Sequence, residues 1–105
     1  MSQLDKLIHQ PVRLQIMAIL VAQDEEAQLG FTALRDTLNL SDGNLGTHLR
    51  KLEDANYVQL NKTFIARKPQ TFIQATPLGR QKFQDHVAML ESILAQAGKP
   101  QTGDK

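Results

Sequence analysis

The chain of 105 residues contains no cysteine and no tryptophan, and aromatic residues make up only 5% of it. Without cysteine it can form no disulfide, no thiolate metal site and no cysteine nucleophile. No apolar run approaches the roughly 20 residues that a membrane-spanning helix needs, and the first residues lack the basic and apolar segments of a secretory signal. We therefore expect a cytoplasmic protein without a membrane partner.

The net charge is also small, at +1, but the charged residues are unevenly distributed along the chain. Carboxylates outnumber cations in residues 1–44, whereas residues 45–80 contain six cations and only two carboxylates. Such a basic block predicts one positive face, which suits a nucleic acid. An accidental cluster on a solvated surface is the alternative.

The spacing of apolar residues predicts a mainly α-helical fold with a small β-hairpin. We expect helices at residues 11–21, 30–38 and 42–55, strands at 57–66 and 71–76 joined by a polar turn at 67–70, and a last helix at 77–97. Pro11 and Pro77 suit first helical positions, and Ser41 and Thr76 suit N-caps. Asn56 suits the left-handed residue that follows the helix ending at 55. Residues 1–97 should form a single domain, with 98–105 as a disordered tail.

The predicted helix at 42–55 has two different sides. Leu45, Leu49 and Leu52 form an edge that we expect to be buried, and the opposite side is small, polar and basic. A helix that lies against protein on one side and in the major groove of DNA on the other has this pattern. Glycine inside a helix costs about 1 kcal/mol relative to alanine, so Gly46, more than Gly43, indicates a close approach of the helix to another molecule. The predicted DNA contacts of this segment are Ser41, Gly43, Asn44, Thr47, His48, Arg50 and Lys51.

Each of these contacts has an expected chemistry. Asn44 can pair bidentately with adenine, the threonine and histidine can reach a base edge or a phosphate, and the two cations suit phosphate or guanine. Lys62, Arg67 and Lys68 of the hairpin should contact the backbone or a minor groove. The alternatives are an ordinary solvated helix face and, for the hairpin, charge and proline that protect a strand edge from aggregation.

The last helix carries an apolar seam that is longer than one small domain needs to close its own core. We expect it to pack on the same helix of a second copy, with residues 1–10 contributing, because two-fold dimers are the commonest soluble oligomers. Alternatively, the first part of the seam closes the core of the monomer. The predicted interface residues are Leu4, Leu7, Ile8, Phe83, Val87, Leu90 and Leu94.

Three segments resemble the winged-helix transcriptional regulators of the MarR and ArsR type, especially their short stand-alone members. They are residues 41–53, residues 56–64 and residues 75–80, and the resemblance extends from about Val12 to Leu94. It implies a winged helix-turn-helix fold with a three-helix core, a hairpin wing and a C-terminal dimerisation helix. It also implies that the third helix of the core and the wing contact DNA.

ArsR-type sensors often bind metal through cysteine and histidine. This chain has no cysteine, and His9, His48 and His86 lie far apart in sequence, so we expect neither a metal nor another cofactor. We expect no separate effector domain within these 105 residues. An unknown small-molecule effector would have to bind in the dimer interface, or between that interface and the helix-turn-helix.

Three classes of function compete. We expect a homodimeric, sequence-specific DNA-binding regulator of transcription. The weak net charge keeps a second possibility open, a winged-helix module that binds proteins and not DNA. An enzyme is not expected, because Ser41 and Ser92 lack an activating partner at a suggestive spacing and no phosphate-binding glycine loop is present.

Overall fold

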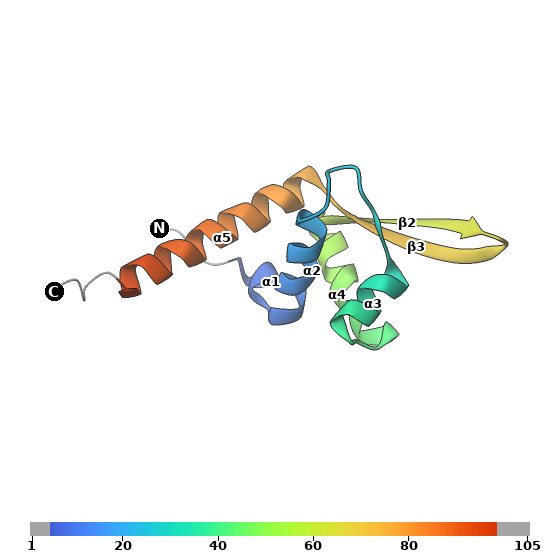
Figure 1. The fold of residues 1–105 in the computed structure, drawn as a ribbon, viewed down its shortest axis with the longest axis horizontal. Coiled ribbons are helices and arrows are strands. Elements are labelled where there is room, and N and C mark those ends of the chain that lie inside the picture. Colours follow the sequence, from blue (N-terminus) through green and yellow to red (C-terminus); the bar gives the residue numbers. More distant parts are fainter. Residues whose placement is uncertain (1–4, 99–105) are drawn as a thin grey trace.

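The computed structural model describes residues 5–98, which form a helical body with a three-stranded sheet (Figure 1). The predicted class, mainly helical with a small β-hairpin, is confirmed. Leu4 and residues 99–105 of the predicted tail lie outside the described residues, whereas Gly98, its first predicted residue, is the last residue of the final helix. In chain order the elements are α1 (Lys6–His9), α2 (Pro11–Val21), β1 (Leu29–Gly30), α3 (Phe31–Leu38), α4 (Asp42–Asp54), β2 (Val58–Ile65), β3 (Lys68–Ala75) and α5 (Pro77–Gly98).

The molecule is elongated, with extents of 65 × 25 × 23 Å. Its radius of gyration is 16.5 Å, whereas a compact domain of this length has about 13 Å. The extra length has two sources: α5 and the β2–β3 hairpin project from the helical body in opposite directions (Figure 1). No helix within residues 5–98 is long and apolar enough to cross a membrane.

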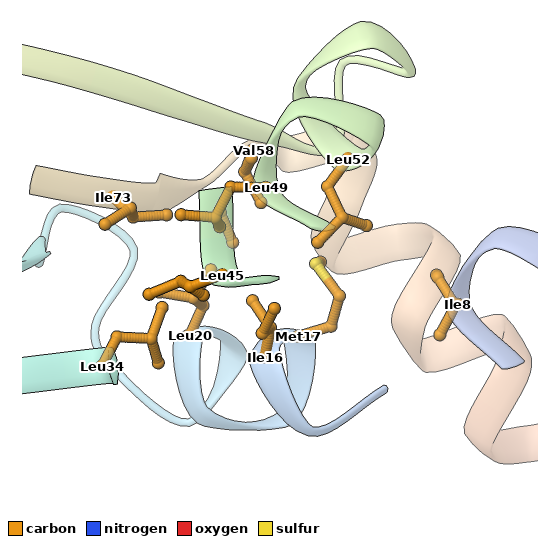
Figure 2. Packing of buried hydrophobic residues seen from close by; sticks show 11 residues of the cluster. Ile8, Ile16, Met17, Leu20, Leu34, Leu45, Leu49, Leu52, Val58 and Ile73 are labelled. Atoms are coloured by element: carbon orange, nitrogen blue, oxygen red, sulfur yellow. The ribbon is translucent and has the colours of Figure 1, made fainter. Parts of the chain in front are cut away.

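The core fixes the position of α4. Leu45, Leu49 and Leu52 are fully buried, as predicted. Figure 2 shows them among the other core side chains, which include Met17 and Leu20 of α2. Burying a leucine side chain contributes about 2 kcal/mol, so this edge holds α4 firmly and leaves its other side facing outward.

The hairpin differs from the prediction at its turn. β2 and β3 pair up to Ile65 and Lys68, and only Ala66 and Arg67 connect them. The predicted turn at 67–70 is therefore wrong, because Lys68, Pro69 and Gln70 belong to β3. The proline suggested a turn, but β3 accommodates it. β1 pairs only with residues 72 and 73 of β3, so at Pro69 this side of β3 is a free edge, where the N–H that proline lacks would have had no partner.

β1 was not predicted either, because two residues are too few to show the alternation of a strand. Leu29 pairs with Ile73 and Gly30 with Phe72, which gives an antiparallel sheet in the order β1-β3-β2.

The wing and α5 begin at one junction. Asn56, in the left-handed conformation that the sequence predicts (φ 65°), follows the end of α4. The Thr76 hydroxyl donates a hydrogen bond to the Asn56 carbonyl (2.7 Å) and accepts one from the N–H of Gly79 (2.9 Å), which confirms it as the cap of α5. A side chain at Gly79 would overlap the carbonyl of Tyr57. The first turn of α5 thus lies directly against the start of the wing.

The same junction is tied to the N-terminal segment. The Tyr57 hydroxyl donates a hydrogen bond to the Asp5 carboxylate (2.8 Å). Asp5 in turn caps α1 by accepting the N–H groups of Leu7 and Ile8. Burial and, second, the bond to Asp5 raise the pKa of Tyr57 to about 12.

We expect the only tyrosine of the chain to ionise with a midpoint near pH 12, which ultraviolet absorbance of the tyrosinate can follow without interference from tryptophan. Because the folded pKa is raised above the ordinary value of 10.0, the stability that Tyr57 contributes is complete below pH 10 and is lost as the pH rises toward 12.

Asp5→Asn is the matched variant, because asparagine caps a helix about as well as aspartate but carries no charge. Its tyrosine midpoint should move partly back toward 10, with burial retaining the remainder. An unchanged midpoint would contradict the contact with Asp5.

Candidate DNA-binding surface

The outward side of α4 carries most of the predicted contacts. The Ser41 hydroxyl accepts the N–H of Asn44 (3.1 Å), which confirms it as the N-cap. Six of the seven predicted residues of this segment are exposed, namely Ser41, Gly43, Asn44, Thr47, Arg50 and Lys51. They form one continuous surface of small, polar and basic groups.

His48, the seventh, is half-buried and faces α2. Its Nδ1 lies 3.1 Å from Nη1 of Arg13. Because arginine can only donate, Nδ1 must accept, and the proton of the neutral ring is then on Nε2. Burial, followed by the charges of Arg13 and Lys51, lowers the pKa of His48. At neutral pH the ring therefore offers a neutral N–H donor rather than a positive charge.

The N-terminus of α4 is tied to α3 by charge. Arg35 forms ion pairs with Asp42 (2.8 Å) and Asp36 (2.9 Å). The hydrogen bonds to Asp42 and Asp36 raise the pKa of Arg35. Exposed pairs of this kind add little stability, but this one offsets a carboxylate at the end of α4 that would repel a phosphate.

A cavity of about 270 Å³ lies between α4 and the hairpin. Arg50 of α4 and Lys62 of β2 both line it, as does Gly46 of α4, and Glu53 is its one carboxylate. No protein neighbour explains why residue 46 is glycine, since no atom lies within 4 Å of the position that a Cβ would take. The cavity is lined by Phe31, Gly46, Leu49, Arg50, Glu53, Leu60, Lys62 and Thr71.

The six cations of the basic block do not all lie on the surface in the structure. Arg50 and Lys51 are exposed on α4. Lys62, Arg67 and Lys68 are exposed along the hairpin. Arg80 instead donates to the carbonyls of Val21 (3.1 Å), Gln23 (3.0 Å) and Asp24 (2.9 Å). It therefore caps the end of α2 and is not part of the surface.

Two other cations join the surface from the acidic half of the sequence. Lys6 and Arg13 lie with Lys51 around a shallow hollow of about 560 Å³ between α1 and α4, which Asp54 lines as its one carboxylate. Arg13 also donates to the carbonyl of Leu7 (2.6 Å). Sequence reasoning missed both cations, because only the fold brings residues 6 and 13 next to residue 51.

The fold also brings two histidines together. Nδ1 of His9 lies 3.4 Å from Nε2 of His86, where α1 meets α5. His86 is 2% exposed, and burial and then the neighbouring His9 lower its pKa. Within residues 5–98, no group of three or more metal-binding side chains comes together, so this pair lacks further protein ligands.

The residues predicted for a dimer interface lie in different environments. Ile8 is fully buried in the core of the chain itself, and Leu7 and Phe83 pack against that core. Val87 and Leu90 are half-buried. Leu94 is 70% exposed, on the part of α5 that extends beyond the body. Only the distal part of the seam is therefore free of the monomer's own packing.

A short helix, a turn and a second helix with an outward polar face, followed by a basic hairpin, define the winged-helix class of DNA-binding domains. The chain belongs to this family: the family described as "Winged helix DNA-binding domain" matches residues 12–94. The resemblance noted in the sequence is thereby confirmed. The family and the fold are those of regulators and not of enzymes.

Similar proteins include an uncharacterized protein of Methanocaldococcus jannaschii, MJ0432, which is 35% identical over 82 residues (78% of this chain and 86% of that protein). Among solved structures, a transcriptional regulator homologue from Pyrococcus horikoshii is 28% identical with a TM-score of 0.81, covering 90% of both chains. A homodimeric winged helix-turn-helix domain from Mycobacterium bovis, a possible ArsR-family regulator, has a TM-score of 0.68 and 13% identity over 87% of this chain and 78% of its own. The similarity to the Mycobacterium bovis domain concerns the fold alone.

We expect Gly46→Ala to separate stability from DNA binding. The new methyl group meets no protein atom, so the free energy of unfolding should rise by about 0.5–1 kcal/mol through better helix propensity. The same methyl group should hinder a phosphate that approaches the cavity and weaken DNA binding about tenfold, as a misplaced contact worth 1.4 kcal/mol would. Chemical unfolding and a DNA titration give the two quantities.

Gly98→Ala is the control, because Gly98 also has open space around it and lies at the far end of α5. It should leave DNA binding unchanged. Equal DNA affinity of Gly46→Ala and the unaltered protein would contradict a close approach at Gly46.

Proposed function

We propose that this protein is a sequence-specific DNA-binding regulator of transcription that acts as a homodimer. In this proposal α4 enters the major groove, and the hairpin lies on the neighbouring backbone or minor groove. The observation that carries it is the two-sided α4, whose leucine edge is fully buried while Asn44, Thr47, Arg50 and Lys51 are exposed on the other side.

Several groups support a division of labour on this surface. Asn44 and Thr47 have the short polar side chains that read base edges from a helix. Lys51, together with Lys6 and Arg13, suits phosphates beside α1, and Lys62 with Arg50 suits phosphates beside the wing. Cations on both sides of a base-reading helix fix its register along the duplex.

The dimer is supported by the exposed apolar end of α5. Ile93 is 43% exposed and Leu94 70% exposed, on a helix that projects away from the body (Figure 1). Large apolar side chains left exposed on a helix favour packing on another helix. The similar Mycobacterium bovis domain is homodimeric.

The first test is selection of fragmented genomic DNA by the purified protein at near-physiological salt. We expect enrichment of a pseudo-palindrome with half-sites about one helical turn, roughly 10 base pairs, apart. On the enriched fragment and a set of its single-base variants, Lys51→Ala should weaken binding to all sequences alike and reduce the salt slope by about 1. Asn44→Ala should instead relax the preference at one base position, at a cost of about 1–3 kcal/mol.

Uniform weakening by Asn44→Ala on every sequence would exclude base reading by Asn44. Retention of DNA without an enriched sequence would contradict specificity and indicate binding to the backbone alone. Failure to retain any DNA at low salt, with a partner protein purifying in a fixed ratio, would replace the proposal with a protein-interaction module.

We expect sedimentation to give twice the monomer mass of 11.8 kDa, and Leu94→Glu to give monomers. Because Leu94 is mostly exposed in the monomer, the substitution should not disturb the fold, whereas a charge in an apolar interface is costly. Gln96→Glu puts the same charge about 200° away on the same helical turn and should leave the dimer intact. A Leu94→Glu protein that still sediments as a dimer would exclude this seam.

A further inference from the structure

The tip of the wing is apolar as well as basic. Phe64 is 73% exposed and Ile65 53% exposed, and Pro69 stands opposite Phe64 in the ladder. In the described part of the chain, the only other large apolar side chain exposed to this extent is Leu94, at the opposite end of the molecule. Isolated exposed apolar residues are ordinary, but a group of neighbouring ones at the end of a projecting hairpin indicates a surface that binds another molecule.

The tip is held in one shape. Strand pairing continues to the last pair, Ile65 and Lys68, and the turn contains only Ala66 and Arg67. Both turn residues have positive φ, 51° and 68°, which matches the tight two-residue hairpin turn but is unfavourable for residues other than glycine or asparagine. The hairpin therefore presents Phe64 in a defined position, and little conformational entropy of the backbone is lost on binding.

Strand alternation determines the direction of Phe64. Leu60, Lys62 and Phe64 share one face of β2, because side chains two residues apart point the same way. Leu60 and Lys62 line the cavity beside α4. Phe64 thus continues the face that borders the proposed DNA-binding surface, whereas Ile65 points to the opposite face.

The charge of the ribbon indicates the partner. Residues 58–75 contain Lys62, Arg67 and Lys68 and no carboxylate. A ribbon with cations around an apolar tip is complementary to a minor groove, where phosphates flank the edges of stacked bases. Proteins that bind this groove often insert an apolar side chain between base pairs and kink the duplex.

We propose that Phe64, with Pro69 beside it, acts as a wedge that enters the minor groove next to the site of α4, partly unstacks one base step and bends the DNA. Lys62, Arg67 and Lys68 neutralise the phosphates on either side. The inference rests on the proposed function, and it adds that the wing distorts its target. It also predicts a preference for easily unstacked pyrimidine–purine steps under the wing, where no base edge is read.

The test compares the unaltered protein with Phe64→Ala and Ile65→Ala on the DNA fragment enriched by selection. The fragment carries a fluorescent donor and acceptor at its two ends to report bending, and 2-aminopurine at the step under the wing to report unstacking. Both substitutions remove an exposed apolar side chain from the same strand, but only Phe64 faces the DNA side. Thermal unfolding verifies that both variants fold.

We expect Phe64→Ala to bind about tenfold more weakly, since a stacking side chain contributes on this scale. The bend and the 2-aminopurine signal should both fall, with an unchanged salt slope because no charge is lost. Ile65→Ala should bind and bend the DNA like the unaltered protein. Lys68→Ala should instead reduce the salt slope by about 1.

Two results would overturn the wedge while leaving the proposed function intact: an unchanged bend with Phe64→Ala, or equal losses with Phe64→Ala and Ile65→Ala. A different result would exclude both the wedge and the proposed DNA-binding function. In that case the unaltered protein would not bind DNA but would bind vesicles of phosphatidylserine and phosphatidylcholine, with losses in both variants, and the tip would be a lipid contact.

Discussion

The burial of one edge of α4 is the constraint on which the rest of the surface depends. Leu45, Leu49 and Leu52 are fully buried, and a helix fixed along one edge has no freedom to rotate about its axis. The opposite residues are therefore presented in a fixed order and direction. His48 adds a polar contact to this apolar one through Arg13 of α2, which also donates to the Leu7 carbonyl of α1. These contacts link α1, α2 and α4 directly beneath the surface that they carry.

The junction at residues 56–57 and 76–79 has a comparable role for the two projections. The wing leaves the body at Tyr57, and α5 begins against the same backbone, with the Thr76 hydroxyl bonded to the Asn56 carbonyl (2.7 Å). Space for this contact exists only because residue 79 is glycine. A change in the direction of α5 must act on the start of the wing. In a dimer built through α5, the distance between the two DNA-binding surfaces would be set at this junction.

The sequence predicts those parts of the fold that depend on local pattern. The leucine edge of α4, the caps at Ser41 and Thr76 and the left-handed Asn56 are examples, because each follows from residue type and spacing within a few positions. What the sequence did not reveal depends on distant segments: β1 is specified by the strand it pairs with, Lys6 and Arg13 join Lys51 only through packing, and Arg80 is withdrawn from the basic block by the carbonyls of α2. The hairpin turn was misplaced because Pro69 is typical of turns, and its tolerance in β3 depends on how far β1 extends.

The outward face of α4 also has an evolutionary consequence. Its base-reading candidates, Asn44 and Thr47, are exposed and lie outside the core that holds the helix in place. Substitutions at such positions usually change stability by less than about 0.5 kcal/mol. Duplicated copies of the gene could therefore diverge in the DNA sequences they bind without first acquiring compensating mutations elsewhere. A lineage could change its regulatory targets in single steps, each carried by a protein that still folds.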